Sequence, residues 1–185
     1  QPFFRISPEG NLTVSPDGPA GDAIDLPKLI GEIRRRGVAA PLLLRFDGIL
    51  RARVRQINTA FNRARREYDY RAPYQGVFPI KVNQERHVVE ALLAEGRSYN
   101  MGLEVGSKPE LIAGISIQAG GAALMICNGY KDHEYVEMAL LASHLGITAV
   151  LVVEKLTELD TILAASDRLG IQPVIGVRSK LTTRG

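Results

Sequence analysis

Strand-like apolar runs alternate with amphipathic helical stretches along most of this chain, and that alternation limits its fold more than any other feature. The runs occupy residues 42–46, 76–82, 99–104, 123–127, 148–153 and 173–178. Repeated alternation of this kind predicts an α/β fold, in which helices cover a parallel sheet. Two architectures fit: a doubly wound open sheet and a (β/α)8 TIM-type barrel. A complete barrel typically needs about 250 residues, so about six strands in 185 residues predict an incomplete barrel.

The residues before the first run follow a different pattern. Residues 3–6 and 12–15 are predicted to be two short strands joined by a turn. Asp25 is placed to cap a helix, and Gly37 is placed to end it. Later helices are predicted near residues 107–118, 132–145 and 157–169.

The composition narrows the possible partners and compartment. The formal net charge of +3 is too small to indicate nucleic acid by itself, and the arginine-rich stretch 51–66 is typical of a solvated helix face. No apolar run is long enough to span a membrane. Cys127 is the only cysteine, which fits a reducing compartment. We therefore expect a cytoplasmic protein with a small-molecule substrate rather than nucleic acid or a membrane as its partner.

Three charged residues lie at or near the ends of strand-like runs and share one alternation. Lys81, Glu104 and Arg178 take the same side of their runs, whereas the large apolar residues take the other side. In a barrel this side points inward, at the end where active sites lie. The alternation predicts one site from three separate segments. The alternative is that Lys81 extends into solvent and that the other two are ordinary edge or capping residues.

A lysine in such a place has a chemical use. Desolvation favours the neutral amine, which can form an imine with an aldehyde. Glu104 would then supply a compensating charge or orient a ring, and Arg178 would bind an anionic oxygen of a cofactor. Asn128 and Gly129 either line the same mouth or form a turn, and the turn is favoured. The three histidines have no metal-ligand spacing, so no metal site is predicted.

Five segments that include these residues resemble the biosynthetic arginine decarboxylases. They are PLLLRF at 41–46, FPIKVNQ at 78–84, GLEVGSKPEL at 102–111, ICNGYKD at 126–132 and GVRSKL at 176–181. The matches stay in register from about residue 2 to residue 185, so the resemblance covers nearly the whole chain.

The resemblance implies the alanine-racemase-like fold, in which a pyridoxal 5'-phosphate (PLP) barrel lies beside a β-domain. Residues 1–20 would then be strands of the β-domain, and residues 21–185 a partial barrel. Carried over by position, Lys81 is the Schiff-base lysine, Glu104 lies near it and the cofactor, and Arg178 lies near the phenolic oxygen of the ring. The implied reaction converts L-arginine to agmatine and CO2 in putrescine and spermidine synthesis. Family members also use Mg2+ and are expected to be homo-oligomers.

In the resembling family, the phosphate-binding glycines and the substrate pocket belong to later segments. We therefore expect residues 1–185 to be inactive alone and to be the N-terminal part of such an enzyme. Other members of the fold stay open as alternatives, namely a diaminopimelate or carboxynorspermidine decarboxylase or an amino-acid racemase. A non-catalytic PLP-binding barrel protein is a third alternative, although such proteins lack the N-terminal strands.

Overall fold

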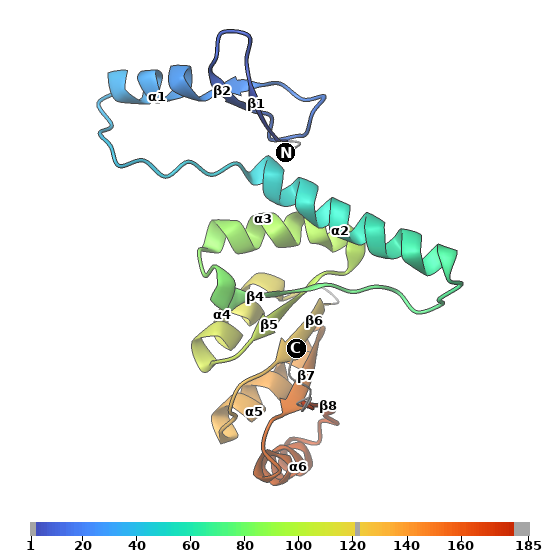
Figure 1. The fold of residues 1–185 in the computed structure, drawn as a ribbon. Helices are drawn as coiled ribbons and strands as arrows, with labels where there is room; N and C mark the ends of the chain where they lie inside the picture. The colour runs from blue at the N-terminus through green and yellow to red at the C-terminus, as the bar shows by residue number, and fades with distance from the viewer. Residues whose placement is uncertain (1–2, 121–122, 180–185) are drawn as a thin grey trace. The chain divides into compact units, whose positions relative to one another are not determined.

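The computed structural model describes residues 3–120 and 123–179, and Figure 1 shows their fold. The last residues of the GVRSKL segment, Lys180 and Leu181, lie outside this description. The chain divides into two compact units, of which the first ends at Arg71 and the second begins at Ala72. The domain boundary predicted between residues 20 and 21 stays a prediction.

The first unit contains a small antiparallel sheet and two helices. The sheet has the order β1 (Phe4–Ile6), β2 (Leu12–Val14) and β3 (Ile24–Asp25). The two predicted N-terminal strands are confirmed, and β3 is an addition to them. Helix α1 (Leu26–Arg35) begins where predicted, because the side chain of Asp25 accepts a hydrogen bond from the amide of Lys28 at 3.0 Å. Helix α2 is longer and spans Asp47–Glu67.

The prediction of a strand at residues 42–46 is wrong. This segment is extended but belongs to neither sheet, and α2 follows it directly. A strand needs a neighbouring strand to bind its backbone groups, and no described strand pairs with these residues. The side chain of Leu43 is also 77% exposed, so the apolar run is not buried in the described residues. The parallel sheet therefore has five strands where six were predicted.

The second unit is the predicted parallel sheet with its helices. All neighbouring strands are parallel, in the sequential order β4-β5-β6-β7-β8. The strands are β4 (Val77–Pro79), β5 (Gly102–Val105), β6 (Ala123–Cys127), β7 (Ile147–Val153) and β8 (Val174–Val177). The helices are α3 (Arg86–Gly96), α4 (Lys108–Gln118), α5 (His133–Leu141) and α6 (Thr157–Leu169), with short 3-10 helices η1 (Ile80–Val82), η2 (Arg97–Tyr99) and η3 (Ala142–Leu145). The α/β class and the helix-covered parallel sheet are confirmed.

The two faces of this sheet differ in burial. One face carries Leu103, Met125 and Leu151, which are fully buried in a core shared with helices α4, α5 and α6. Figure 1 shows α4 and α5 along this side of the strands. On the opposite face, the strand register aligns Glu104 with Ile126, which is only partly buried. Polar residues on this second face are therefore free to line a site, while the first face holds the unit together.

The buried thiol of Cys127 gives a first test of this core. Cys127 is 0% exposed, and desolvation raises its pKa to about 11. Because only the thiolate reacts, we expect native protein at pH 8 to be alkylated there about two orders of magnitude more slowly than an exposed cysteine. Peptide mapping by mass spectrometry after timed alkylation measures this rate. Denaturant should restore ordinary reactivity, and rapid labelling of Cys127 in the native protein would contradict the core described here.

Candidate functional site

A cavity of about 720 Å³ opens at the carboxyl ends of the parallel strands. Lys81, Glu104 and Arg178 all line it, so the structure brings the three predicted residues together. The lining also includes Glu110, in the first turn of α4, and residues of the loops after β5, β6 and β7, namely Gly106, Asn128, Gly129, Tyr130 and Glu154. The volume is in the usual range for small-molecule pockets. The carboxyl edge of a parallel sheet is also where such folds commonly bind ligands.

Lys81 lies on a turn rather than on a strand. Strand β4 ends at Pro79, and Lys81 is the middle residue of the following 3-10 helix, η1. Its Nζ lies 3.2 Å from Oε1 of Glu104. The expected desolvation is not observed, since the side chain of Lys81 is 61% exposed at the cavity mouth. The turn carries the lysine out of the pleat of the sheet, and this explains its exposure.

Glu104 is the most deeply buried charge that lines the cavity. It is 5% exposed, and its Oε1 accepts hydrogen bonds from Lys81 and from Nδ2 of Asn128 at 2.9 Å. Its other oxygen, Oε2, is buried and has no hydrogen-bond partner among the described residues. A buried carboxylate oxygen without a donor is costly. A ligand that carries a proton donor into this cavity would relieve that cost.

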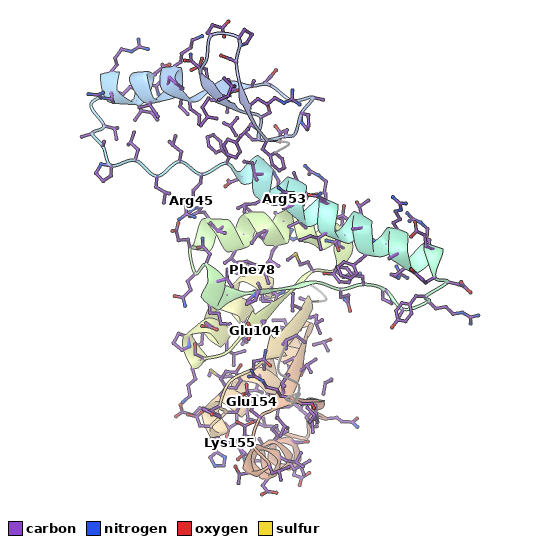
Figure 2. The ribbon with its side chains drawn as sticks, viewed as in Figure 1. Arg45, Arg53, Phe78, Glu104, Glu154 and Lys155 are labelled. Carbon is purple, nitrogen blue, oxygen red and sulfur yellow. The ribbon has the colours of Figure 1, made fainter. Side chains whose placement is uncertain are left out.

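Arg178 has a partner that the sequence did not reveal. Its Nη1 donates to Oε2 of Glu154 at 3.0 Å, and Glu154 lies directly after β7. The other oxygen of Glu154 accepts from the amide of Gly129 at 2.7 Å. Figure 2 labels Glu104 and Glu154, two of the carboxylates that line the cavity. The side chain of Glu154 is 15% exposed and lines the cavity.

Asn128 and Gly129 combine both roles that the sequence left open. Gly129 has a positive φ of 76°, as expected in a turn, and both residues line the cavity. The amide of Asn128 continues the sheet ladder to the carbonyl oxygen of Val105 at 2.9 Å. The turn thus begins within the sheet and presents the side chain of Asn128 to Glu104.

A buried ion pair lies behind these loops. The side chains of Lys131 and Glu158 are 0% and 5% exposed, with Nζ and Oε2 3.6 Å apart. Desolvation raises the pKa of Glu158, but hydrogen bonds from the amides of Glu154 and Lys131, with the ammonium of Lys131, outweigh it and leave the pKa below its usual 4.5. A carboxylate with a lowered pKa stabilises the fold above its unfolded-state pKa, and this contribution is lost as the pH falls through the folded value.

We therefore expect the stability difference between wild type and Glu158→Gln to depend on pH. At neutral pH the variant should lose roughly 3 kcal/mol, because it leaves the charge of Lys131 buried without a counter-charge. The difference should begin to shrink as the pH falls below 4.5, where the carboxylate of the unfolded wild-type chain takes up a proton, and should shrink further until the folded carboxylate is protonated at a lower pH. Melting temperatures of both proteins from about pH 7 to about pH 3 measure this. Glu137→Gln, which breaks the more exposed pair with Arg168, is the control and should show little difference at any pH. A constant difference for Glu158→Gln would contradict the assignment.

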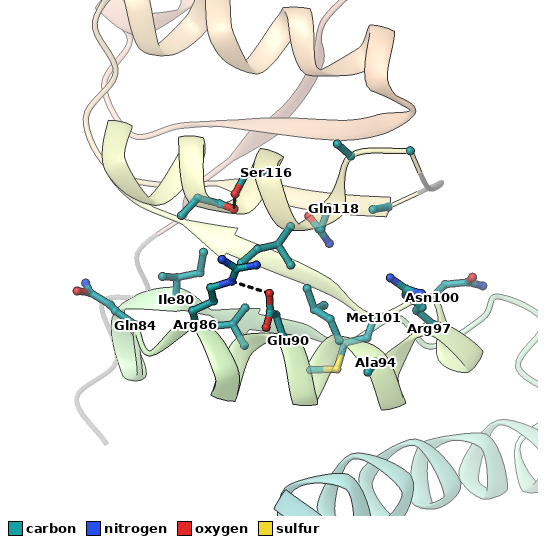
Figure 3. A pocket seen from close by; sticks show the side chains of 17 residues that line it. Ile80, Gln84, Arg86, Glu90, Ala94, Arg97, Asn100, Met101, Ser116 and Gln118 are labelled. Atoms are coloured by element: carbon teal, nitrogen blue, oxygen red, sulfur yellow. Dashed lines mark hydrogen bonds and ion pairs between the residues drawn. The ribbon is translucent and has the colours of Figure 1, made fainter.

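A larger hollow of about 950 Å³ lies elsewhere in this unit, between α3 and α4 (Figure 3). Its lining includes Gln118 and the ion pair of Arg86 with Glu90, at 2.7 Å. It contains none of the three predicted site residues. The three residues grouped by strand alternation therefore all lie in the smaller cavity, at the ends of the strands.

Residues 3–120 and 123–179 lack two further kinds of feature. No cluster of three or more histidine, cysteine, aspartate or glutamate residues there is arranged to hold a metal ion. None of the helices in those residues combines the length and hydrophobicity needed to cross a bilayer.

Biosynthetic arginine decarboxylases are among the relatives of this chain. It is 47% identical to the biosynthetic arginine decarboxylase of Thermosynechococcus vestitus over its full length, and 49% identical to that of Gloeobacter violaceus. The chain spans 29% of the length of each of these relatives. The crystal structure of the biosynthetic arginine decarboxylase SpeA from Campylobacter jejuni superposes with a TM-score of 0.85 at 30% identity. That match covers 96% of this chain and 29% of the other.

A family model gives the broader assignment. The model described as "Pyridoxal-dependent decarboxylase, pyridoxal binding domain" matches residues 54–183, which include Lys81, Glu104 and Arg178. The match covers more than half of the chain and all of its parallel sheet. The chain therefore belongs to the pyridoxal-dependent decarboxylase family and carries the pyridoxal-binding domain of that family.

Proposed function

We propose that this protein decarboxylates L-arginine to agmatine and CO2 with PLP as its cofactor, and that Lys81 is the lysine that holds the cofactor covalently. The contact between Lys81 and the buried Glu104, at the mouth of a cavity in a pyridoxal-binding domain, is the observation that supports this most. The choice of arginine rests on the relatives, which are named biosynthetic arginine decarboxylases.

The residues around the cavity fit such a cofactor. Lys81 offers a primary amine at the mouth, and Arg178 offers a guanidinium suited to an anionic ring oxygen. Glu104 offers a buried oxygen, Oε2, that accepts no hydrogen bond from the described residues. When bound, PLP supplies the electron sink for the electron pair left by the loss of CO2.

Glu104 also has a role in the proton balance of Lys81. An amine attacks a carbonyl only in its neutral form. The Oε1 atom of Glu104 is within hydrogen-bond distance of the ammonium, at 3.2 Å, so it is placed to accept the proton that Lys81 must lose. The hydrogen bond from Asn128 holds that oxygen in position.

The wider proposal follows the family resemblance. Residues 1–20 would contribute strands to a β-domain, and residues 21–185 part of a PLP barrel. We expect a homo-oligomer, a place in putrescine and spermidine synthesis, and a requirement for Mg2+. The single cysteine supports a reducing compartment, the cytoplasm.

The test uses protein expressed from its complete gene. Borohydride reduction of the PLP-loaded protein, followed by peptide mapping, should place the pyridoxyl group on Lys81. Incubation with arginine, ornithine, lysine and diaminopimelate should release CO2 from arginine in preference to the others, with agmatine as product. Release from diaminopimelate instead would favour another decarboxylase of the fold. Bound PLP without turnover of any amino acid would favour the non-catalytic alternative.

A further inference from the structure

Lys131 makes its contacts entirely within the protein. Its side chain is 0% exposed, so it does not reach a ligand in the cavity. Its Nζ donates to the carbonyl oxygen of Gly129 at 2.6 Å and to that of Val152 in β7. Burying an ammonium is costly unless hydrogen bonds and a counter-charge compensate it. Here two carbonyl oxygens and Glu158 do so, and they tie the turn after β6 to the end of β7.

Glu158 makes the matching contacts from the first turn of α6. Its Oε1 accepts from the amide of Lys131 at 3.2 Å, and its Oε2 accepts from the amide of Glu154 at 2.9 Å. The ion pair therefore binds two amides and two carbonyl oxygens of the backbone, in the loops after β6 and β7 and at the end of β7 itself. A pair of apolar residues would fill the same space but would leave these backbone groups without their partners.

Both loops continue directly into the cavity. Glu154, whose amide Glu158 binds, uses its own carboxylate to hold Arg178 and the amide of Gly129. Asn128 precedes Gly129 and holds Glu104, which contacts Lys81. Hydrogen bonds, together with the peptide bond between Asn128 and Gly129, thus connect the buried pair with all three predicted site residues.

We propose that Lys131 and Glu158 are positioning residues for the cofactor site, acting through Glu154 on Arg178 and through the Asn128–Gly129 turn on Glu104. This inference rests on the proposed function. The long side chains of Glu154 and Arg178 have several rotatable bonds. Glu154 therefore needs a fixed backbone if its carboxylate is to hold Arg178 in one position. The pair supplies that fixed backbone, so its loss should weaken cofactor binding by way of Arg178.

The experiment is a double-mutant cycle in protein from the complete gene. The dissociation constant of PLP is measured by absorbance titration of the cofactor-free protein for wild type, Glu158→Gln, Arg178→Met and the combined variant. Glu158→Gln alone should raise this constant about tenfold. In the Arg178→Met background the same change should raise it by less than about threefold, because the route through Glu154 has lost its endpoint and only the route through Asn128 to Glu104 remains.

Two further variants separate positioning from general stability. Lys131→Met combined with Glu158→Leu replaces the pair by apolar side chains, which often preserve the fold. This variant should melt below the wild type, because it leaves backbone groups of both segments without partners, and at temperatures where it is fully folded it should still bind PLP about tenfold more weakly. Glu137→Gln is the control and should leave the dissociation constant unchanged in both backgrounds.

The outcomes distinguish failure of the positioning role from failure of the proposed function. Effects of Glu158→Gln and Arg178→Met that multiply fully would overturn the inference, because the pair would then act only through general stability. Wild-type affinity in Glu158→Gln or in the apolar pair variant would also overturn it. A wild-type protein that neither binds PLP nor decarboxylates arginine would instead overturn the proposed function, and the inference with it.

Discussion

Replacement of Lys81 by alanine is expected to abolish covalent attachment of PLP and to lower arginine decarboxylation by about three orders of magnitude or more. The amine of Lys81 is the only group that the variant removes from the cavity mouth. Its partner, Glu104, keeps its hydrogen bond from Asn128, so the carboxylate should stay in place. The absorbance band of the lysine-bound cofactor and the rate of CO2 release, measured on protein from the complete gene, test this expectation.

Lys81→Arg separates the chemistry from the ion pair. Arginine keeps the positive charge opposite Glu104 but stays protonated at any relevant pH and cannot serve as the amine. We expect this variant to lose as much activity as Lys81→Ala while melting near the wild-type temperature. Lys28→Ala, at an exposed lysine of α1, is the control and should keep full activity. Activity retained by either Lys81 variant would show that another lysine holds the cofactor.

Strand alternation predicted much of the second unit because it depends on a short and regular period. Side chains alternate every two residues along a strand, so the sequence placed Leu103 on the face opposite Glu104, and Leu103 is fully buried. The run 123–127 coincides with β6. The run 42–46 has the same apolar character but remains unpaired, because pairing depends on a neighbouring strand that a local pattern does not specify.

The candidate site was predictable only where it followed the strands. Alternation grouped Lys81, Glu104 and Arg178, and the structure places all three around one cavity. It did not foresee that β4 ends before Lys81, which leaves that side chain more exposed than expected.

No sequence periodicity predicts that Lys131 and Glu158 form a pair. The backbone amide of Lys131 and the carboxylate of Glu158 meet across 27 residues, from a loop and a helix start. Glu154 is similar, since its role depends on the turn at Gly129 and on Arg178 beyond the next strand. Contacts between loops are set by tertiary structure, and only the general rule that buried charges are paired would have suggested a search for them.

Gly129→Ala is the second change with a large expected effect. Gly129 has a φ of 76°, and a β-carbon there would lie 2.4 Å from the carbonyl oxygen of Gly106. Both obstacles are backbone features, so no side chain can move aside to relieve them. Left-handed strain and overpacking together should cost about 3 kcal/mol of unfolding free energy or more. Urea denaturation of protein from the complete gene measures the loss.

The same substitution should also weaken PLP binding by the protein that remains folded, because Gly106 and Gly129 both line the cavity. The turn must shift away from Gly106, and Gly129 is the residue whose amide binds Glu154 and whose carbonyl oxygen binds Lys131. Gly170→Ala is the matched control, with a similar φ of 66° but nothing within 4 Å of an added β-carbon. It should cost only about 1 kcal/mol and leave the PLP dissociation constant unchanged. If both substitutions changed stability and PLP affinity equally, only the positive φ would matter. The close approach of Gly129 to Gly106 would then have no effect on the site.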